Sequence, residues 1–281
     1  MSDKDRKRQV ANEVLTLLRD HSPLTLEMLH LMTTPPIQKK NLRQAIGIMK
    51  RKGIVDMVMG SPSTFYYQLN NAETVRDEVA QRLKDDKTKA ARPLLNRRNW
   101  IHNQWCEFWA LTIKRAFPDV EIIREHVIES HALARSILQQ QGKPLDLLPD
   151  FLMIFPKTAT KEKVSVAFEI ERTRKSDERI LQKLKTYIYE THIDGLIYVC
   201  DSGRLSETIR LLYRKKTLEK AHKKRGYTEN FFLFSDSMSA GDNPLSSFYN
   251  ANGQPASLIN WCHTLRATST EFRKDNQFFD A

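Results

Sequence analysis

Cysteine is scarce in this chain. Its 281 residues include three cysteines, Cys106, Cys200 and Cys262, which lie far apart and form no Cys-x-x-Cys pair. Neither a disulfide framework nor a cysteine zinc site is expected from such spacing. Histidines such as His102 show no metal-ligand spacing either. We therefore expect a protein of a reducing compartment, without a zinc site.

Long apolar runs are also lacking. No stretch approaches the roughly 20 apolar residues of a membrane span. The polar first residues, MSDKDRKRQVANE, lack the apolar core of a signal peptide. These absences predict a cytoplasmic protein with no membrane segment. The 40% hydrophobic content is enough for one large core or two modest ones.

Negative charge is in deficit. The chain has 45 Lys and Arg against 34 Asp and Glu, a formal net charge of +11. A chain this basic is expected to bind a polyanion, most often nucleic acid. The excess is concentrated in residues 1–98 (19 Lys/Arg, 11 Asp/Glu) and in residues 204–225 (nine Lys/Arg, two Asp/Glu). A nuclease needs such basic surfaces to hold phosphates, beside acids that hold a metal.

Residues 1–72 show three helical segments followed by a β-hairpin. Apolar residues recur at helical spacing over residues 7–20, and Thr25 is a candidate N-cap for LEMLHLM. Residues 38–52 form a third helix with six basic residues and no acid, which Gly53 is placed to end. IVDMVMG and TFYYQL, joined by Ser-Pro-Ser, complete the hairpin. This order is typical of a winged helix-turn-helix domain.

The third helix of a winged helix enters the major groove of DNA. Three of its polar side chains are expected to read base edges: Gln38, Asn41 and Gln44. Its basic side chains are expected to hold phosphates: Lys39, Lys40, Arg43, Lys50, Arg51 and Lys52. Further phosphate contacts are expected from the second basic segment: Arg214, Lys215 and Lys216. The alternatives are a solvated basic face and a winged helix that joins proteins to one another.

The remaining chain predicts a charged helix and linker, an α/β domain and a tail. Residues 73–98 are highly charged and contain Pro93, which places the domain boundary near residue 95. Residues 99–235 predict the order helix, three strands, helix, strand. The segments are a helix at 99–117, strands at 120–128, 149–155 and 163–171, a helix at 176–190, and strands at 194–200 and 231–234. Residues 236–281 predict a loop with one short helix.

Three acidic residues stand where these strands would bring them together. Asp150 follows Pro149 at the start of one strand, and Glu169 and Glu171 share one face of the next, because alternate residues of a strand point the same way. A helix carrying Lys183 follows. Such an oxygen cluster suits a hard divalent cation, and phosphodiester hydrolysis uses such a cation.

A plainer interpretation makes Glu169 and Glu171 an ordinary solvated face. The neighbouring basic residues, Arg172, Arg174 and Lys175, would then be their ion-pair partners. That interpretation explains the glutamates but leaves Pro149-Asp150 unexplained.

The second domain resembles the restriction-endonuclease-like fold known by its PD-(D/E)XK signature, through Pro149-Asp150, Glu169-Ile170-Glu171 and the order of its elements. In that family the Asp and the next acid bind magnesium or manganese, and the Lys orients the attacking water. Glu171 occupies the position of the usual Lys, which is a departure. Some members carry Glu there, and others place the Lys on the following helix. Lys183 suits the second case.

The segment EIERTRKSDERILQKLKTY is similar to a block of the plasmid replication–relaxation proteins and of the mobilisation protein C relaxases of conjugative elements. Those proteins combine a winged helix with a nuclease-like domain and act at plasmid origins. The resemblance covers residues 99–200. It implies that Mg²⁺ or Mn²⁺ is held by Asp150, Glu169 and Glu171. Lys183 is then the site base or charge stabiliser, with Lys175 and Lys185 as poorer candidates.

The resemblance also implies a functional tyrosine near the metal, Tyr187, and places His102 close to the same site. In a relaxase, Tyr187 or Tyr189 would attack phosphorus and store the strand end as an ester. Tyr187 also falls in the apolar stripe of its helix, with Ile180 and Leu184, so core packing is its alternative role.

The function implied is a metal-dependent DNA endonuclease or relaxase of a bacterial mobile element. Its expected partners are double-stranded DNA at a plasmid origin, relaxosome or replication proteins, and a second copy of the chain. The alternative is a non-catalytic DNA-binding replication or transcription factor with a degenerate nuclease fold, which Glu171 in the Lys position keeps open. A nuclease acting on branched DNA is a third hypothesis.

Overall fold

The structure is a computed structural model that describes most of the chain. The described residues are 2–21, 23–61, 64–84, 100–138, 148–156, 163–189, 191–215, 231–236, 238 and 244–268. The linker around Pro93, the residue Lys216 and the second half of the basic segment 204–225 lie outside them. The chain divides into two compact units, Met1–Thr112 and Ile113–Ala281.

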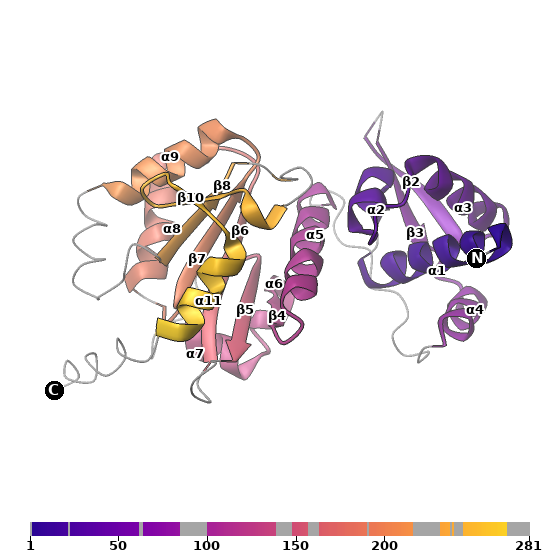
Figure 1. The fold of residues 1–281 in the computed structure, drawn as a ribbon, viewed down its shortest axis with the longest axis horizontal. Helices are drawn as coiled ribbons and strands as arrows, with labels where there is room; N and C mark the ends of the chain where they lie inside the picture. Colours follow the sequence, from indigo (N-terminus) through magenta and orange to yellow (C-terminus); the bar gives the residue numbers. More distant parts are fainter. Residues whose placement is uncertain are drawn as a thin grey trace. The chain divides into compact units, whose positions relative to one another are not determined.

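The first unit contains the three helices and the hairpin that the sequence predicts (Figure 1). Its elements are α1 (Asp3–His21), β1 (Leu24–Thr25), α2 (Leu26–Met32), α3 (Lys39–Arg51), β2 (Val55–Ser61), β3 (Thr64–Leu69) and α4 (Glu73–Leu83). The three strands form an antiparallel sheet in the order β1-β3-β2. Strand β1 was not predicted, because two residues are too short a run to show a strand period.

Local sequence explains where these helices begin and end. The side chain of Thr25 caps α2 by accepting a hydrogen bond from the backbone N–H of Met28, at 3.3 Å. Gly53, at φ +71°, follows α3 in the left-handed conformation that glycine adopts without strain. The buried face of α3 consists of Leu42, Ala45, Ile46 and Met49. The basic side chains are therefore left for its other faces.

The second unit is built on a seven-stranded mixed sheet in the order β10-β9-β8-β7-β6-β5-β4. Its strands are β4 (Glu121–Arg124), β5 (Phe151–Pro156), β6 (Lys163–Glu171), β7 (Gly195–Cys200), β8 (Phe232–Ser235), β9 (Phe248–Asn250) and β10 (Pro255–Ala256). Strands β6, β7 and β8 are parallel, and the other neighbours are antiparallel. The fold class is therefore α/β, as predicted.

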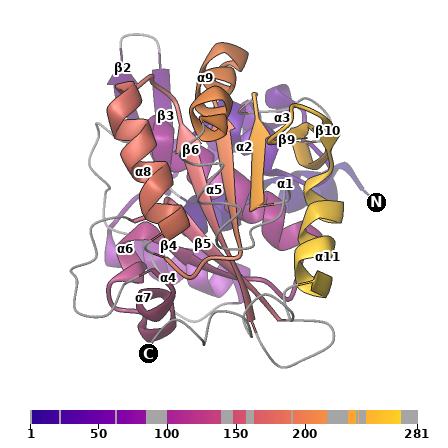
Figure 2. The same ribbon diagram turned by 90° about the vertical axis from the view of Figure 1, so that its left-hand side faces the viewer.

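Helices cover both faces of this sheet. The helical elements are the end of α5 (Trp100–Ala116), then α6 (Glu125–Ile128), α7 (Ala132–Leu138), α8 (Asp177–Tyr189), α9 (Gly203–Arg214), the 3-10 turn η4 (Pro244–Ser246) and α11 (Leu258–Thr268). Helices α8 and α9 connect the parallel strands, and right-handed crossovers in one direction place them on the same face. Figure 2 shows α8 and α11 on opposite sides of the sheet.

Strand β6 is the centre of the second unit. Every residue from Val164 to Glu171 is buried, because α8 and α9 cover one face and further side chains cover the other. Ala167 belongs to the α8 side, together with Leu152 of β5 and Leu196 of β7. Glu169 and Glu171 alternate with it and face the same way. The interpretation of these two glutamates as a solvated face is therefore wrong.

Two predicted boundaries differ from the structure. The strand predicted at 120–128 ends at Arg124, and α6 begins at Glu125, because the partner strand begins at Phe151, opposite Arg124. The predicted domain boundary near residue 95 lies before α5, whereas the compact units divide within that helix. Most of α5, from Trp100 to Thr112, belongs to the first unit, where Gln104 accepts a hydrogen bond from the Thr25 backbone at 2.8 Å.

The tail is more ordered than the sequence predicts. Strands β9 and β10 extend the sheet beyond β8, so residues 248–256 are part of the second unit and not a loop. Helix α11 is the predicted short helix. All three cysteines are buried. Among the described residues, no helix is both long enough and apolar enough to cross a membrane.

Gly195 tests how α11 docks on the sheet. A Cβ at this position would lie 2.6 Å from the Trp261 ring and 2.9 Å from Leu265. We therefore expect Gly195→Ala to destabilise the second unit by about 1–3 kcal/mol, as overpacked cores do, measured by urea unfolding. Gly47→Ala is the control, because no atom outside its chain neighbours and the backbone of its own helix lies within 4 Å of that Cβ, and alanine is the better helix former. Equal stability of both variants would contradict this packing.

Candidate metal centre at the end of strand β6

Asp150 lies beside Glu169 across the β5–β6 pair. The antiparallel register pairs Phe151 with Phe168, and one further step places Asp150 opposite Glu169. The backbone N–H of Ile170 donates a hydrogen bond of 2.6 Å to Asp150 Oδ2. That bond holds the Asp150 carboxylate beside the segment of β6 that carries Glu169 and Glu171.

Glu169 is a buried acid held by two donors from α8. Its side chain is 4% exposed, and its Oε2 lies 2.6 Å from Lys183 Nζ. Its Oε1 accepts a hydrogen bond from the Tyr187 hydroxyl. Residues 183 and 187 are one helical turn apart, so both side chains reach the same carboxylate. Each carboxylate oxygen has a second lone pair, which leaves capacity for another ligand.

Burial controls the charge of this group. Burial raises the pKa of Glu169 from its ordinary value of 4.5 to about 7, with Lys183 opposing the rise and Asp150 adding to it. For Lys183, burial lowers the pKa, but the ion pair with Glu169 outweighs it and the pKa lies above its ordinary value of 10.5. The lysine is therefore a fixed positive charge, and Glu169 is the group that exchanges a proton near neutrality.

Glu171 continues the acidic face one pleat further along β6. It is 5% exposed, and its Oε2 lies 2.7 Å from Lys175 Nζ. Lys175, a poorer candidate for the site lysine than Lys183, lies against the second glutamate. Lys185, the other such candidate, is exposed on α8. The cluster thus combines three carboxylates with two ammonium groups.

Two buried tyrosines flank Glu169. Tyr187 is fully buried in the apolar stripe with Ile180 and Leu184, and burial raises its pKa well above 10. Tyr198 lies beside Glu169 in the parallel β6–β7 register. Among the residues that the structure describes, its buried hydroxyl has no hydrogen-bond partner. Burial likewise raises the pKa of the neighbouring Cys200 thiol, which disfavours a thiolate ligand there.

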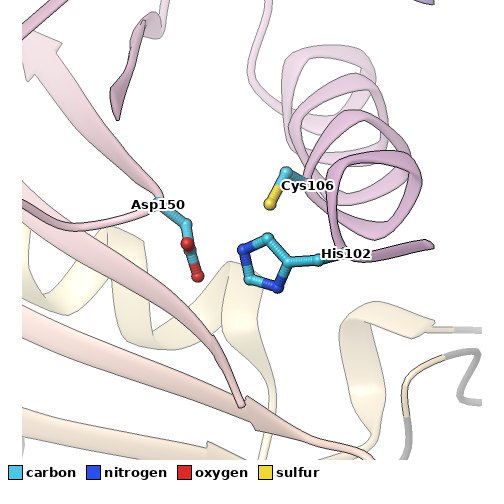
Figure 3. Close-up of side chains that lie close together, drawn as sticks. All are labelled: His102, Cys106 and Asp150. Carbon is cyan, nitrogen blue, oxygen red and sulfur yellow. The ribbon is translucent and has the colours of Figure 1, made fainter. Parts of the chain in front are cut away.

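The donor set suits a hard cation. Asp150, Glu169 and Glu171 offer only carboxylate oxygens, which magnesium and manganese prefer. The ligand atoms of Asp150, His102 and Cys106 also lie within 4.8 Å of one another (Figure 3). A group of imidazole, thiol and carboxylate is not specific to Mg²⁺ or Mn²⁺.

The residues predicted to bind DNA lie mostly on the surface. On α3 and at its ends, the exposed residues are Gln38, Lys40, Arg43, Gln44, Lys50, Arg51 and Lys52. Lys39 and Asn41 are half-buried, and Lys39 forms an ion pair with Glu27 of α2. Arg214 and Lys215 are exposed at the end of α9. The structure therefore leaves an exposed basic helix in the first unit.

Tyr198 is the side chain at this site that sequence reasoning missed. It stands in the middle of the apolar run GLIYVC, where a tyrosine is expected to be a core residue. Only the register of β7 against β6 shows that it lies level with Glu169. Recognition of the parallel pair β6–β7 would have identified it.

Comparison with protein-family models, curated proteins and solved structures finds no match for this chain. The interpretation of the site therefore rests on its own geometry.

Removal of the lysine should destabilise the protein in a pH-dependent way. We expect Lys183→Met to cost about 3 kcal/mol or more at pH 8, because it leaves a buried carboxylate without its cation. The cost should be smaller at pH 5. At pH 5 Glu169 is protonated, because its pKa in the folded protein is about 7. Its charge destabilises the fold only as the pH rises from its ordinary pKa of 4.5 through its folded pKa of about 7.

Urea unfolding at the two pH values measures this difference. Lys185→Met is the matched control, because Lys185 is exposed two residues further along α8, and its cost should be small at both pH values. An equal loss of stability at pH 5 and pH 8 for Lys183→Met would contradict the described pairing.

Proposed function

We propose that the chain is a divalent-metal-dependent DNA endonuclease that nicks one strand. The observation that carries this proposal is the buried carboxylate cluster at the end of β6, with Lys183 supplied by the next helix. Such a cluster is costly to bury unless a cation or proton compensates it. Phosphodiester hydrolysis is one chemistry that uses a hard cation, and a lysine there would offset negative charge on the phosphate.

The arrangement of the sheet supports a restriction-endonuclease-like core. Strands β4, β5 and β6 are antiparallel neighbours, β7 is parallel to β6, and α8 lies between β6 and β7 in the chain. This is the order in which the sequence resembles the PD-(D/E)XK family. Asp150 immediately precedes β5 and Glu169 lies near the end of β6, which supports the proposed assignment of the two acids.

The residues of the cluster have separate roles in this proposal. Asp150, Glu169 and Glu171 would hold Mg²⁺ or Mn²⁺. A bound cation of this kind supplies charge for the phosphate and makes its bound water more acidic. Lys183 fixes the orientation of Glu169 and offsets negative charge on the phosphate. Tyr187 holds the other oxygen of Glu169.

Hydrolysis by water is the better-supported route. A tyrosine nucleophile needs access to phosphorus and a lowered pKa. Tyr187 is fully buried, donates to Glu169 and has a raised pKa. We therefore assign it a positioning role.

Tyr187→Phe should keep measurable nicking and form no protein–DNA ester. If Tyr187 were the nucleophile, this variant would lose all activity.

The first unit has features that support a DNA-binding role for it. Its order of helices and strands is that of a winged helix, and α3 exposes Lys40, Arg43, Lys50 and Arg51 with no acid on the helix. In this proposal α3 selects the DNA site and the second unit cuts it. A bacterial plasmid origin, with relaxosome or replication proteins and a second copy of the chain, is the setting that the sequence resemblance favours.

Supercoiled plasmid tests the enzyme. The protein should convert it to open circles with Mn²⁺ or Mg²⁺ and not with EDTA. Asp150→Asn should slow the conversion by about 100-fold or more, since a lost ligand costs at least as much as a lost supporting contact. Glu178→Gln is the matched control, because Glu178 is an exposed acid on α8 and lies outside the carboxylate cluster. DNA binding without conversion under any metal would favour the non-catalytic DNA-binding factor.

Salt dependence tests the DNA-binding helix. In Lys40→Gln/Arg43→Gln, the slope of log binding constant against log salt should fall by about 2, because each phosphate contact contributes about 0.9. Arg76→Gln, an exposed arginine on α4, is the control and should leave the slope unchanged. An unchanged slope in the double variant would show that α3 does not carry the phosphate contacts.

A further inference from the structure

The first unit contains a cavity. It has a volume of about 330 Å³ and is lined by residues of α1, α3 and α4 and by Lys52, the residue after α3. Figure 1 shows these helices in the first unit. Among the described residues, its lining includes five cations and no acid. The five are Arg6, Lys7, Arg8, Lys52 and Arg82.

The floor of this cavity is apolar. It is formed by side chains such as Val10 of α1 and Ile48 and Met49 of α3. Ile48 is 40% exposed although it is a large hydrophobic residue. A cavity of this size with an apolar floor and a few polar groups is typical of small-molecule sites. The floor does not suit a sugar–phosphate backbone, which offers charge but little apolar surface.

Helix α3 presents the cavity and the DNA contacts on adjoining faces. Asn41, Gln44, Ile48 and Lys52 recur every three or four residues and line the cavity. Lys40, Arg43 and Lys50 do not line it. Asn41 and Gln44 are also predicted to read bases. A molecule in the cavity would therefore cover Asn41 and Gln44, two of the residues predicted to read bases.

We propose that this cavity binds a small amphipathic organic anion, an aryl or alkyl carboxylate or phosphate, and that such a ligand competes with DNA. The apolar body lies on Val10, Ile48 and Met49, and the anionic group pairs with the arginines and lysines at the rim. The proposed binding of the anion rests on the cavity alone. The competition with DNA rests on the proposed function of α3.

Binding is tested with 2-naphthoate on the whole protein, with neutral 2-naphthol as its match. Methyl NMR should show saturable shifts of Ile48 and Met49 with 2-naphthoate, and binding of 2-naphthol should be weaker. Equal binding of both compounds, or no shift at these methyl groups, would overturn the proposal.

Substitutions locate the anionic contact. Arg6→Gln/Lys52→Gln should weaken 2-naphthoate binding by about two- to thirtyfold, the range for two exposed ion pairs. Lys40→Gln/Lys50→Gln removes the same charge from the other side of α3 and should change it less than twofold. Ile48→Glu, at a partly exposed position, should abolish binding without unfolding the protein. Equal effects of the two double variants would mean that the anion is attracted by net charge alone, and would overturn the proposed site.

The competition has its own readout. Saturating 2-naphthoate should weaken duplex binding at least threefold in the wild type and leave it unchanged in Ile48→Glu. Naphthoate binding without an effect on bound duplex would overturn the competition. A chain that binds naphthoate but no duplex would overturn the proposed DNA function and keep the anion site.

Discussion

The burial of Glu169 is the constraint on which the second unit depends. A carboxylate at the centre of a covered sheet is costly unless it is paired. Here the cost is met by Lys183 and Tyr187, both from one turn of α8. The pairing places Lys183 of α8 on Glu169, which lies opposite Asp150 and on the same face of β6 as Glu171. An apolar residue at position 169 would pack with less difficulty, so stability alone does not explain the arrangement.

The two units divide the electrostatic work. The second unit concentrates its buried acids at one end of β6, where each faces a lysine or lies beside another carboxylate. The first unit keeps its cations on the surface of α3 and around the cavity beside α1. Exposed cations bind phosphates by a screened, salt-dependent attraction. Buried carboxylates bind a cation through short, geometric contacts. In the proposed function, recognition and chemistry require different surroundings, and the two units differ in this way.

Much of this arrangement was predictable because strong periodic signals carried it. The helical stripe of Ile180, Leu184 and Tyr187 and the alternation along β6 placed Lys183 and Glu169 toward each other. What failed depended on partners that are distant in sequence. Strand β1 forms only because β3 pairs with it, and β9 only because β8 offers an edge. The end of β4 at Arg124 is set by where β5 begins. The position of Tyr198 required the register of a parallel pair, which a single sequence does not show.

The central claim is that the three acids form a cation site, and manganese binding tests it most directly. Electron paramagnetic resonance of Mn²⁺ titrated into the whole protein, at pH 6 and pH 8, would be compared with Asp150→Asn. The account predicts saturable binding that tightens with pH, because Glu169, whose pKa is about 7, must release its proton to serve as a ligand. The variant should lose that binding. Absence of binding in the wild type, or equal binding in the variant, would contradict the claim.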